Sequence, residues 1–390
     1  MARVGSATCL ALLALTLTTG ACTGEDKPSP AANGGLQTVG HYGGDDKGKG
    51  QYSPYALAPN GDMLVGFMPD SNHPERLMGG TTQMGWRVGE EVTPISVPKS
   101  GAYRQTIAAD IDGEAVVWRQ TASTRLDIED WVILATTDHK NAHIVASNTE
   151  YYKTDSPPLF NPDHHPLAVV GDQVFWSVVD WPTARPESPK TNPGEYPGRQ
   201  TYRVLRRSIS GKGPVREVAE GAYGPSGAHD RLVYIDDARL RTGRNSGEVR
   251  IMEMRESNSG QEIHSLGQLT KGAGIPTACG GEGYTAWIRS RSTRAELEIL
   301  LEGGDQPRRV PLETTASAAT LACGDGFVTW GRDRNRALLH DIPSGKTTVL
   351  QATASSSRPL VAGHMVAWPG AIDQSRGVQW SIGTWTAFPQ

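Results

Sequence analysis

Short apolar runs recur along the chain, and seven of them follow a turn that contains glycine or an acidic residue. Five of these runs end on tryptophan at the same aligned position. The spacing between aligned tryptophans falls from 58 residues (Trp118 to Trp176) to 38 (Trp330 to Trp368). A strand pattern that is kept while its spacing drifts indicates a repeat array. The runs are Met63–Val65, Ala115–Trp118, Val174–Trp176, Leu232–Tyr234, Tyr284–Trp287, Phe327–Trp330 and Met365–Trp368.

Each repeat contains four short strands joined by turns, which is typical of a propeller blade. The chain has 45 glycines and 26 prolines and no long helical periodicity, so its folded part is predicted to be all-β. We expect a β-propeller of seven blades with four antiparallel strands each, with six blades plus a degenerate closing sheet as the alternative. The strands expected in the second repeat are Gln105–Asp112, Glu114–Gln120, Asp130–Thr137 and Ala142–Ser147, and those in the sixth are Ala319–Gly324, Phe327–Gly331, Ala337–Ile342 and Lys346–Leu350.

The aligned aromatic side chains are expected to pack between neighbouring blades, because a large apolar group at one fixed strand position fills the wedge between two sheets. The last repeat, Pro359–Phe388, is expected to supply all four of its own strands. Closure of the ring would then depend on side-chain packing or on a strand added from Leu36–Tyr42.

The N-terminus has the pattern of an export signal. Arg3 precedes an uncharged run from Val4 to Cys22, which is too short to span a bilayer comfortably. The end of this run, Thr19-Gly20-Ala21-Cys22, resembles the lipobox of bacterial lipoproteins, in which the cysteine is acylated. The resemblance implies that residues 1–22 are a lipoprotein-type signal peptide and that Cys22 carries lipid. Thr19 replaces the usual leucine, so cleavage followed by release is the alternative.

Residues 23–50 are rich in Gly, Pro, Ser, Asp and Lys, a composition that cannot repay the entropy of ordering. They are expected to form a disordered tether, followed by the propeller at residues 51–390. No later segment has the pattern of a transmembrane helix. The protein is therefore expected outside the cytoplasm, anchored to the bacterial cell membrane by its N-terminal lipid, or secreted. A net charge of −4 gives no basic field for nucleic acid as a partner.

Two cysteines remain in the predicted mature body, Cys279 and Cys323, each between alanine and glycine in consecutive repeats. One interpretation is a disulfide that joins neighbouring inner strands in an oxidising compartment. The other is a pair of buried thiols that act as small apolar groups. The choice depends on whether the two Cα atoms approach within about 7 Å.

Two kinds of turn show a further resemblance. Ser53–Asp62 looks like the Ser-Pro-Asp-Gly opening of TolB-like blades, within the wider WD40-like propeller superfamily, and Asn258–Gln261 and Ile342–Lys346 look like their outer hairpins. The resemblance implies a secreted scaffold without a particular activity, since such propellers include binding proteins, peptidase domains and sugar-active enzymes.

Motifs for known chemistry are scarce. Gly224–Ala228 lacks the last glycine of a nucleophile elbow, and the chain has no metalloprotease or phosphate-loop motif. Asp163, His164 and His165 are metal-ligand types, but consecutive side chains point apart and no second histidine cluster completes the set. A surface histidine pair is the preferred interpretation, and no metal ion, cofactor or catalytic residue is expected.

The longest connections are predicted on one face of the ring. Second-to-third strand connections are long in the first four repeats, and the blade-to-blade connection Asn148–His165 emerges on the same face, beside Asp180–Thr201. Long structured loops are often functional, and rigid aromatics suit a protein, peptide or glycan ligand. The aromatics could instead pin the loops onto the propeller. The ligand-binding candidates here are Tyr151, Tyr152, Phe160, His164, His165, Asp180, Trp181, Arg185 and Tyr196.

Charged residues give two further candidate groups. Asp236 and Asp237, with Asp180, could act as acid and base across the pore, because glycoside hydrolysis needs paired carboxylates. A solvated salt-bridge cluster is the preferred interpretation. Three arginines just past the aligned aromatic could converge on an anionic ligand or pair between blades. These arginines are Arg119, Arg289 and Arg332.

Two functions follow from these patterns. The first is a lipid-anchored binding protein that takes a protein, peptide or glycan on the loops of blades 1 to 4, without catalysis. The second is an enzyme that acts on polysaccharide or another polar substrate in the central funnel. An enzyme should show buried carboxylates or a histidine within a few ångströms of one another in the funnel, with perturbed acidity. A binder should present an apolar and aromatic surface without them.

Overall fold

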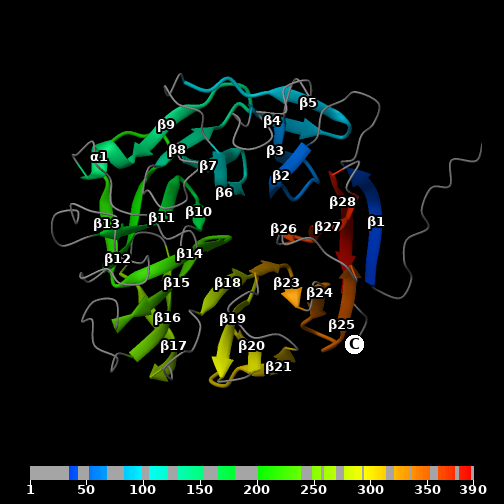
Figure 1. The fold of residues 1–390 in the computed structure, drawn as a ribbon. Helices are drawn as coiled ribbons and strands as arrows, with labels where there is room; N and C mark the ends of the chain where they lie inside the picture. The colour runs from blue at the N-terminus through cyan, green and yellow to red at the C-terminus, as the bar shows by residue number, and fades with distance from the viewer. Residues whose placement is uncertain are drawn as a thin grey trace, which may run out of the picture. The chain divides into compact units, whose positions relative to one another are not determined.

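A computed structural model gives the protein as seven four-stranded antiparallel sheets arranged as blades around a common axis (Figure 1). The seven-bladed β-propeller predicted from the repeats is confirmed. The structure describes residues 35–42, 52–67, 83–98, 105–121, 131–152, 166–180, 201–238, 248–255, 259–268, 276–291, 294–312, 320–333, 336–351, 359–373 and 377–387.

Blades 1 to 4 each consist of four consecutive strands that pair in chain order from the axis outward. Blade 1 contains β2 (Tyr52–Leu57), β3 (Met63–Phe67), β4 (Gln83–Val88) and β5 (Glu91–Pro94); blade 2 contains β6 (Gln105–Asp112), β7 (Ala115–Thr121), β8 (Trp131–Thr136) and β9 (His143–Ser147); blade 3 contains β10 (Leu167–Val170), β11 (Gln173–Asp180), β12 (Thr201–Ser208) and β13 (Arg216–Glu220); blade 4 contains β14 (Ala222–Ala228), β15 (Arg231–Asp237), β16 (Glu248–Arg255) and β17 (Gln261–Gln268).

Blades 5 and 6 follow the same plan, and blade 7 combines the two ends of the propeller. Blade 5 contains β18 (Thr277–Gly281), β19 (Tyr284–Arg291), β20 (Arg294–Leu301) and β21 (Arg308–Leu312); blade 6 contains β22 (Thr320–Gly324), β23 (Phe327–Asp333), β24 (Arg336–Asp341) and β25 (Thr347–Gln351); blade 7 contains β26 (Leu360–Ala362), β27 (Met365–Asp373), β28 (Gly377–Thr386) and β1 (Gly35–Tyr42).

An N-terminal strand closes the ring. β1 pairs antiparallel with β28, from Gly35 opposite Thr386 to Tyr42 opposite Trp380, and is the outermost strand of blade 7 (Figure 1). The expectation that the last repeat supplies all four of its strands is therefore wrong, and the added strand is the route to closure. The expected disordered tether is also wrong over Gly35–Tyr42, because pairing with β28 and packing of Leu36 against the blade 7 core order this segment.

The aligned aromatics pack between blades as predicted. Trp118, Trp176 and Trp287 have no exposed surface, and Tyr234, Trp330 and Trp368 are at most 4% exposed. Each belongs to a cluster with side chains of the preceding blade; Trp176, for example, meets Trp131 of blade 2 edge-on, with ring centroids 6.0 Å apart. The repeated indole is thus the wedge that joins each sheet to the one before it.

A disulfide bond joins Cys279 on β18 to Cys323 on β22, with the Cα atoms 5.7 Å apart. The first strand of every blade contacts the first strands of both neighbouring blades, so these strands form the inner ring around the axis. Close approach at the axis brings the two cysteines within bonding distance, and the alternative of two free buried thiols is wrong.

In the described part of the chain, no helix combines the length and apolar character that crossing a bilayer requires. The short helix α1 (Asn148–Tyr152) follows β9 at the outer rim of blade 2. The side chain of Tyr151, on this helix, packs against the core shared by blades 2 and 3.

Candidate functional site

The strand order gives the propeller two different faces. Turns between the first and second strands, and between the third and fourth, lie on one face, which we name the turn face. Second-to-third and blade-to-blade connections lie on the opposite face, which we name the loop face. The strand boundaries confirm that the second-to-third connections are longer in blades 1 to 4 than in blades 5 to 7.

Most of the loop-face candidates fall outside the described residues, and a ligand site there stays a prediction. Tyr151 is half-buried against the core of blades 2 and 3, which fits the interpretation that it pins its loop. Tyr152 ends α1, and Asp180 ends β11 opposite Thr201. The candidates outside the described residues are Phe160, His164, His165, Trp181, Arg185 and Tyr196.

Two of the three arginines, Arg119 and Arg289, make contacts to neighbouring blades. Arg119 has no exposed surface; it donates a hydrogen bond to the Ser177 carbonyl oxygen at 2.8 Å and places its guanidinium 5.1 Å from the ring centroid of Trp131. It is buried between blades 2 and 3, which fits the alternative of a contact between blades. Arg289 donates to the Leu266 carbonyl of blade 4 at 2.8 Å, and the Arg332 side chain lies outside the described set.

Asp236 and Asp237 lie near the end of β15 and expose only 7% and 1% of their surface. Asp236 faces Arg250 across the β15–β16 ladder, and the Asp237 backbone N–H donates to the Gly221 carbonyl at 2.8 Å. Both carboxylates are buried, and an acid–base role for them stays a prediction.

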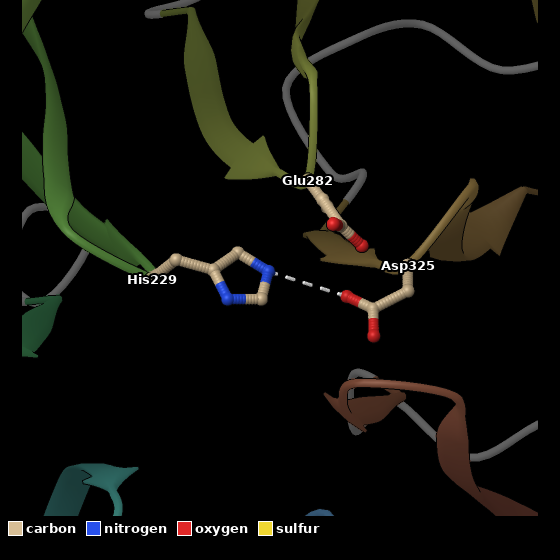
Figure 2. A group of neighbouring side chains, drawn as sticks. All are labelled: His229, Glu282 and Asp325. Atoms are coloured by element: carbon tan, nitrogen blue, oxygen red, sulfur yellow. Dashed lines mark ion pairs between the residues drawn. The ribbon is translucent and has the colours of Figure 1, made fainter.

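The turn face brings together three residues that the sequence keeps far apart. His229, Glu282 and Asp325 occupy the first-to-second strand turns of blades 4, 5 and 6 and point toward one another (Figure 2). One ligand-type atom from each lies within 4.8 Å of the others, and His229 Nε2 is 3.4 Å from Asp325 Oδ1. The blade 7 turn adds His364, whose Nε2 is 3.8 Å from Asp325 Oδ2. We name these four residues the axial cluster.

Local backbone structure presents His229 to the centre of the cluster. Its φ of 51° lies in the left-handed region, where the equivalent turns of three other blades carry glycine. A non-glycine residue there costs about 1 kcal/mol, and residues held at such angles concentrate at functional sites. The glycines are Gly113, Gly171 and Gly363, with φ of 57°, 58° and 56°.

A partly open pocket of about 760 Å³ adjoins the cluster between blades 3 and 4. Its apolar lining comes from the buried side chains Phe175, Leu232 and Met254. His229 also lines the pocket and connects it to the axial cluster. Pockets that combine an apolar floor with a few convergent polar groups are typical of ligand sites.

One wall of the pocket is cationic. Arg206 on β12 lies directly opposite Arg216 on β13, and Lys212 extends from the turn between these strands. No ion pair to any of the three occurs among the residues that the structure describes. Arg207, in contrast, is bonded to Glu150 and to backbone carbonyls. Like charges directly opposite each other destabilise a strand pair, so an anionic group between them would be favoured.

The opposite side of the pocket carries carboxylates. Asp112 accepts a hydrogen bond from the Gly171 N–H at 2.8 Å, which ties blade 2 to blade 3. Asp172 and Asp230 are exposed in the blade 3 and blade 4 turns. The pocket can therefore take a ligand that has an anionic group for the cationic wall and donors for these carboxylates.

The sequence did contain a signal for the axial cluster, but it required the correct register. Counting back from the aligned aromatic gives the same offset three times: 234 − 229 = 5, 287 − 282 = 5 and 330 − 325 = 5. The three residues thus occupy one structural position in consecutive blades. A search for motifs along the chain could not find them, because each lies in a different repeat.

No protein-family model and no curated protein matches this chain. It is similar in structure to a puromycin-hydrolysing peptidase from Mycobacterium tuberculosis (14% identity, TM-score 0.50, 92% of this chain), of which it spans only 57%. It is also similar to an oligogalacturonate lyase from Vibrio parahaemolyticus, with 9% identity and a TM-score of 0.50 over 90% of this chain and 98% of the lyase. A third similar structure is an oligogalacturonate lyase in complex with manganese, with 7% identity and a TM-score of 0.51 over 91% of this chain and 98% of the lyase. At these identities the likeness shows the propeller fold alone.

Proposed function

We propose that the protein is a binding protein, held outside the cytoplasm by lipid on Cys22, which takes an anionic peptide or glycan in the turn-face pocket of blades 3 and 4. The observation that carries the proposal is the opposed pair Arg206 and Arg216 beside Lys212, above an apolar floor. Charge-assisted hydrogen bonds from paired guanidinium groups suit carboxylate, sulfate or phosphate.

Two observations support the location. The Thr19–Cys22 segment resembles a lipobox, and the similarity of the blade turns to TolB-like propellers fits an extracytoplasmic scaffold. The Cys279–Cys323 disulfide is in accord with an oxidising compartment. Radiolabelled palmitate incorporation, compared between the natural chain and Cys22→Ala, tests the anchor; equal labelling would reject it.

Binding is tested with the full chain, purified in detergent and applied to an array of acidic and neutral glycans and peptides. We expect acidic members to bind, and Arg206→Gln/Arg216→Gln to weaken binding at least tenfold, since each charge-assisted hydrogen bond contributes about 1.5–3 kcal/mol. Affinity should also fall as salt rises, because the interaction is partly exposed.

Arg203→Gln is the matched control, because Arg203 lies on the same strand but forms ion pairs with Glu217 and Glu220. It should leave affinity unchanged. Equal binding by the double variant and the natural chain would reject the pocket as the ligand site.

A second function, an enzyme acting on a polar substrate, is favoured by the axial cluster. His229, Asp325 and Glu282 bring a histidine and two carboxylates close together beside a pocket, although His229 and Glu282 are exposed rather than buried. A histidine oriented by a carboxylate is a general base or acid in many reactions. Product formation from oligogalacturonates or acidic peptides, abolished by His229→Gly, would establish catalysis; binding without turnover would establish the binding protein.

A further inference from the structure

We propose that the axial cluster binds one divalent cation of the Zn²⁺ or Mn²⁺ type, with His229, Glu282 and Asp325 as ligands and His364 beside Asp325. Mixed imidazole and carboxylate donors suit these ions, whereas Ca²⁺ and Mg²⁺ prefer oxygen donors alone. This site goes beyond the proposed binding function, because Glu282 and Asp325 do not line the pocket.

The distances fit a coordinated ion. Bonds from Zn²⁺ to nitrogen and oxygen ligands are about 2.0–2.2 Å, which sets the ligand atoms of a tetrahedral site roughly 3.4 Å apart. His229 Nε2 and Asp325 Oδ1 are separated by 3.4 Å, and His364 Nε2 lies 3.8 Å from the other oxygen of Asp325. Glu282 completes the set within 4.8 Å and is exposed, so rotation of its side chain can close the remaining distance.

The charges also favour a cation. Two carboxylates, Glu282 and Asp325, approach each other at the axis, and in the described part of the chain Glu282 has no ion-pair partner. The buried guanidinium of Arg231, behind the blade 5 turn, is committed to Glu253 and to the carbonyl oxygens of Gly281 and Tyr284. A divalent ion would neutralise both carboxylates, whereas the described partners of Asp325 are the two histidines, which carry charge only when protonated.

Interblade hydrogen bonds hold the ligand turns in place. The Asp325 backbone N–H donates to the Gly363 carbonyl at 2.9 Å, which joins the turns of blades 6 and 7. The Tyr284 hydroxyl donates to the Gly324 carbonyl at 2.9 Å and joins blade 5 to blade 6. Ligands fixed on neighbouring rigid turns lose little entropy when they coordinate an ion.

Comparison of the blades indicates that His229, Glu282 and Asp325 are not needed to form their turns. Blades 2 and 3 place Gly113 and Gly171 at the position that His229, Glu282 and Asp325 occupy in blades 4, 5 and 6. A two-residue turn therefore forms with glycine at this position, although blades 5 and 6 place their left-handed residue one position later, at Gly283 and Gly326. Three ligand-type side chains on one side of the axis are an addition to the blade pattern.

The test measures Zn²⁺ and Mn²⁺ binding to the chelator-stripped full chain in detergent, by calorimetry and by metal content after dialysis. We expect one ion per chain, and at least a tenfold loss of affinity in Glu282→Gln/Asp325→Asn. His229→Gly should give a similar loss while keeping the left-handed turn. Saturating metal should raise Tm in the natural chain and not in these variants, because an ion that binds only the folded state stabilises it.

Two controls distinguish this site from others. Glu114→Gln removes an exposed carboxylate from the equivalent turn of blade 2 and should leave affinity unchanged. His164→Ala/His165→Ala removes the histidine pair that the sequence predicts on the loop face and should also leave the affinity unchanged. Retention of the ion by Glu282→Gln/Asp325→Asn, its loss in His164→Ala/His165→Ala, or no binding by the natural chain would each overturn the proposal. Ligand binding in the pocket is measured separately and does not depend on this result.

Discussion

The hydroxyl of Tyr284 donates a hydrogen bond to the carbonyl oxygen of Gly324 at 2.9 Å, which joins the inner turn of blade 5 to that of blade 6. Burial raises the pKa of the Tyr284 phenol well above its ordinary value, so the group remains a proton donor. Glu282 and Asp325 stand on the two turns that it joins, so this hydrogen bond, with the disulfide between β18 and β22, holds the two carboxylates of the axial cluster at their spacing.

Tyr284→Phe should lower the free energy of unfolding by about 1–2 kcal/mol, because buried carbonyl oxygens lose their donor while ring packing is kept. It should also weaken metal binding, since the turns are no longer joined. Urea unfolding and metal titration measure the two effects. Unchanged stability would show that the hydroxyl bond is unimportant.

Trp176→Ala should lower the free energy of unfolding by about 3–5 kcal/mol, because it removes a fully buried indole from the interface of blades 2 and 3. Trp176→Phe should cost less, since it keeps part of the aromatic contact with Trp131. Urea unfolding of both variants checks the order. Equal stability of Trp176→Ala and the natural chain would contradict the role of the aligned indole as an interblade wedge.

Strand positions were predictable because the repeat and the turns are local features of the sequence. In the second repeat, β6 to β9 begin and end within one residue of the predictions. The strand Gly35–Tyr42 falls within the segment predicted to be a tether, because the composition around it is typical of one. Its partner β28 lies at the other end of the chain. This strand is ordered by pairing with β28, and amino-acid composition alone does not predict such a non-local pairing.

The candidate site was less predictable than the fold. Charge type gave no sign that Arg119 is fully buried, since its partners Ser177 and Trp131 come from other strands. The axial cluster depends on four turns in four blades, so it appears only when the repeats are aligned and closed into a ring. Loop length can be read from the sequence, and it predicted a ligand site on the loop face instead of the turn face.

The disulfide should stabilise the propeller by about 3–4 kcal/mol, because it closes a loop of 44 residues between blades 5 and 6. Cys279→Ser/Cys323→Ser, or reduction of the natural chain, should lower the urea midpoint accordingly. Adding reductant to the double variant is the control and should have no further effect. A midpoint that does not move on reduction would contradict the bond.

Stability should decline in mild acid. Burial lowers the pKa of the His264 and His340 imidazoles below their ordinary value of 6.5, so the folded state disfavours their protonated forms. As pH falls below about 6.5, the unfolded chain takes up protons that the folded protein resists, and stability is lost. Tm measured between pH 7.5 and 5 should fall, with a smaller slope in His264→Gln/His340→Gln. An equal slope in both proteins would contradict this assignment.

The central claim is that ligand binds on the turn face, in the pocket beside the axial cluster. The most direct measurement compares the affinity of the full chain for its best acidic array ligand in two variants, Arg206→Gln/Arg216→Gln and a replacement of residues 153–165 by a short Gly-Ser turn. We predict at least a tenfold loss in the first variant and natural affinity in the second. Natural affinity in the first variant and loss in the second would contradict the claim and place the ligand on the loop face.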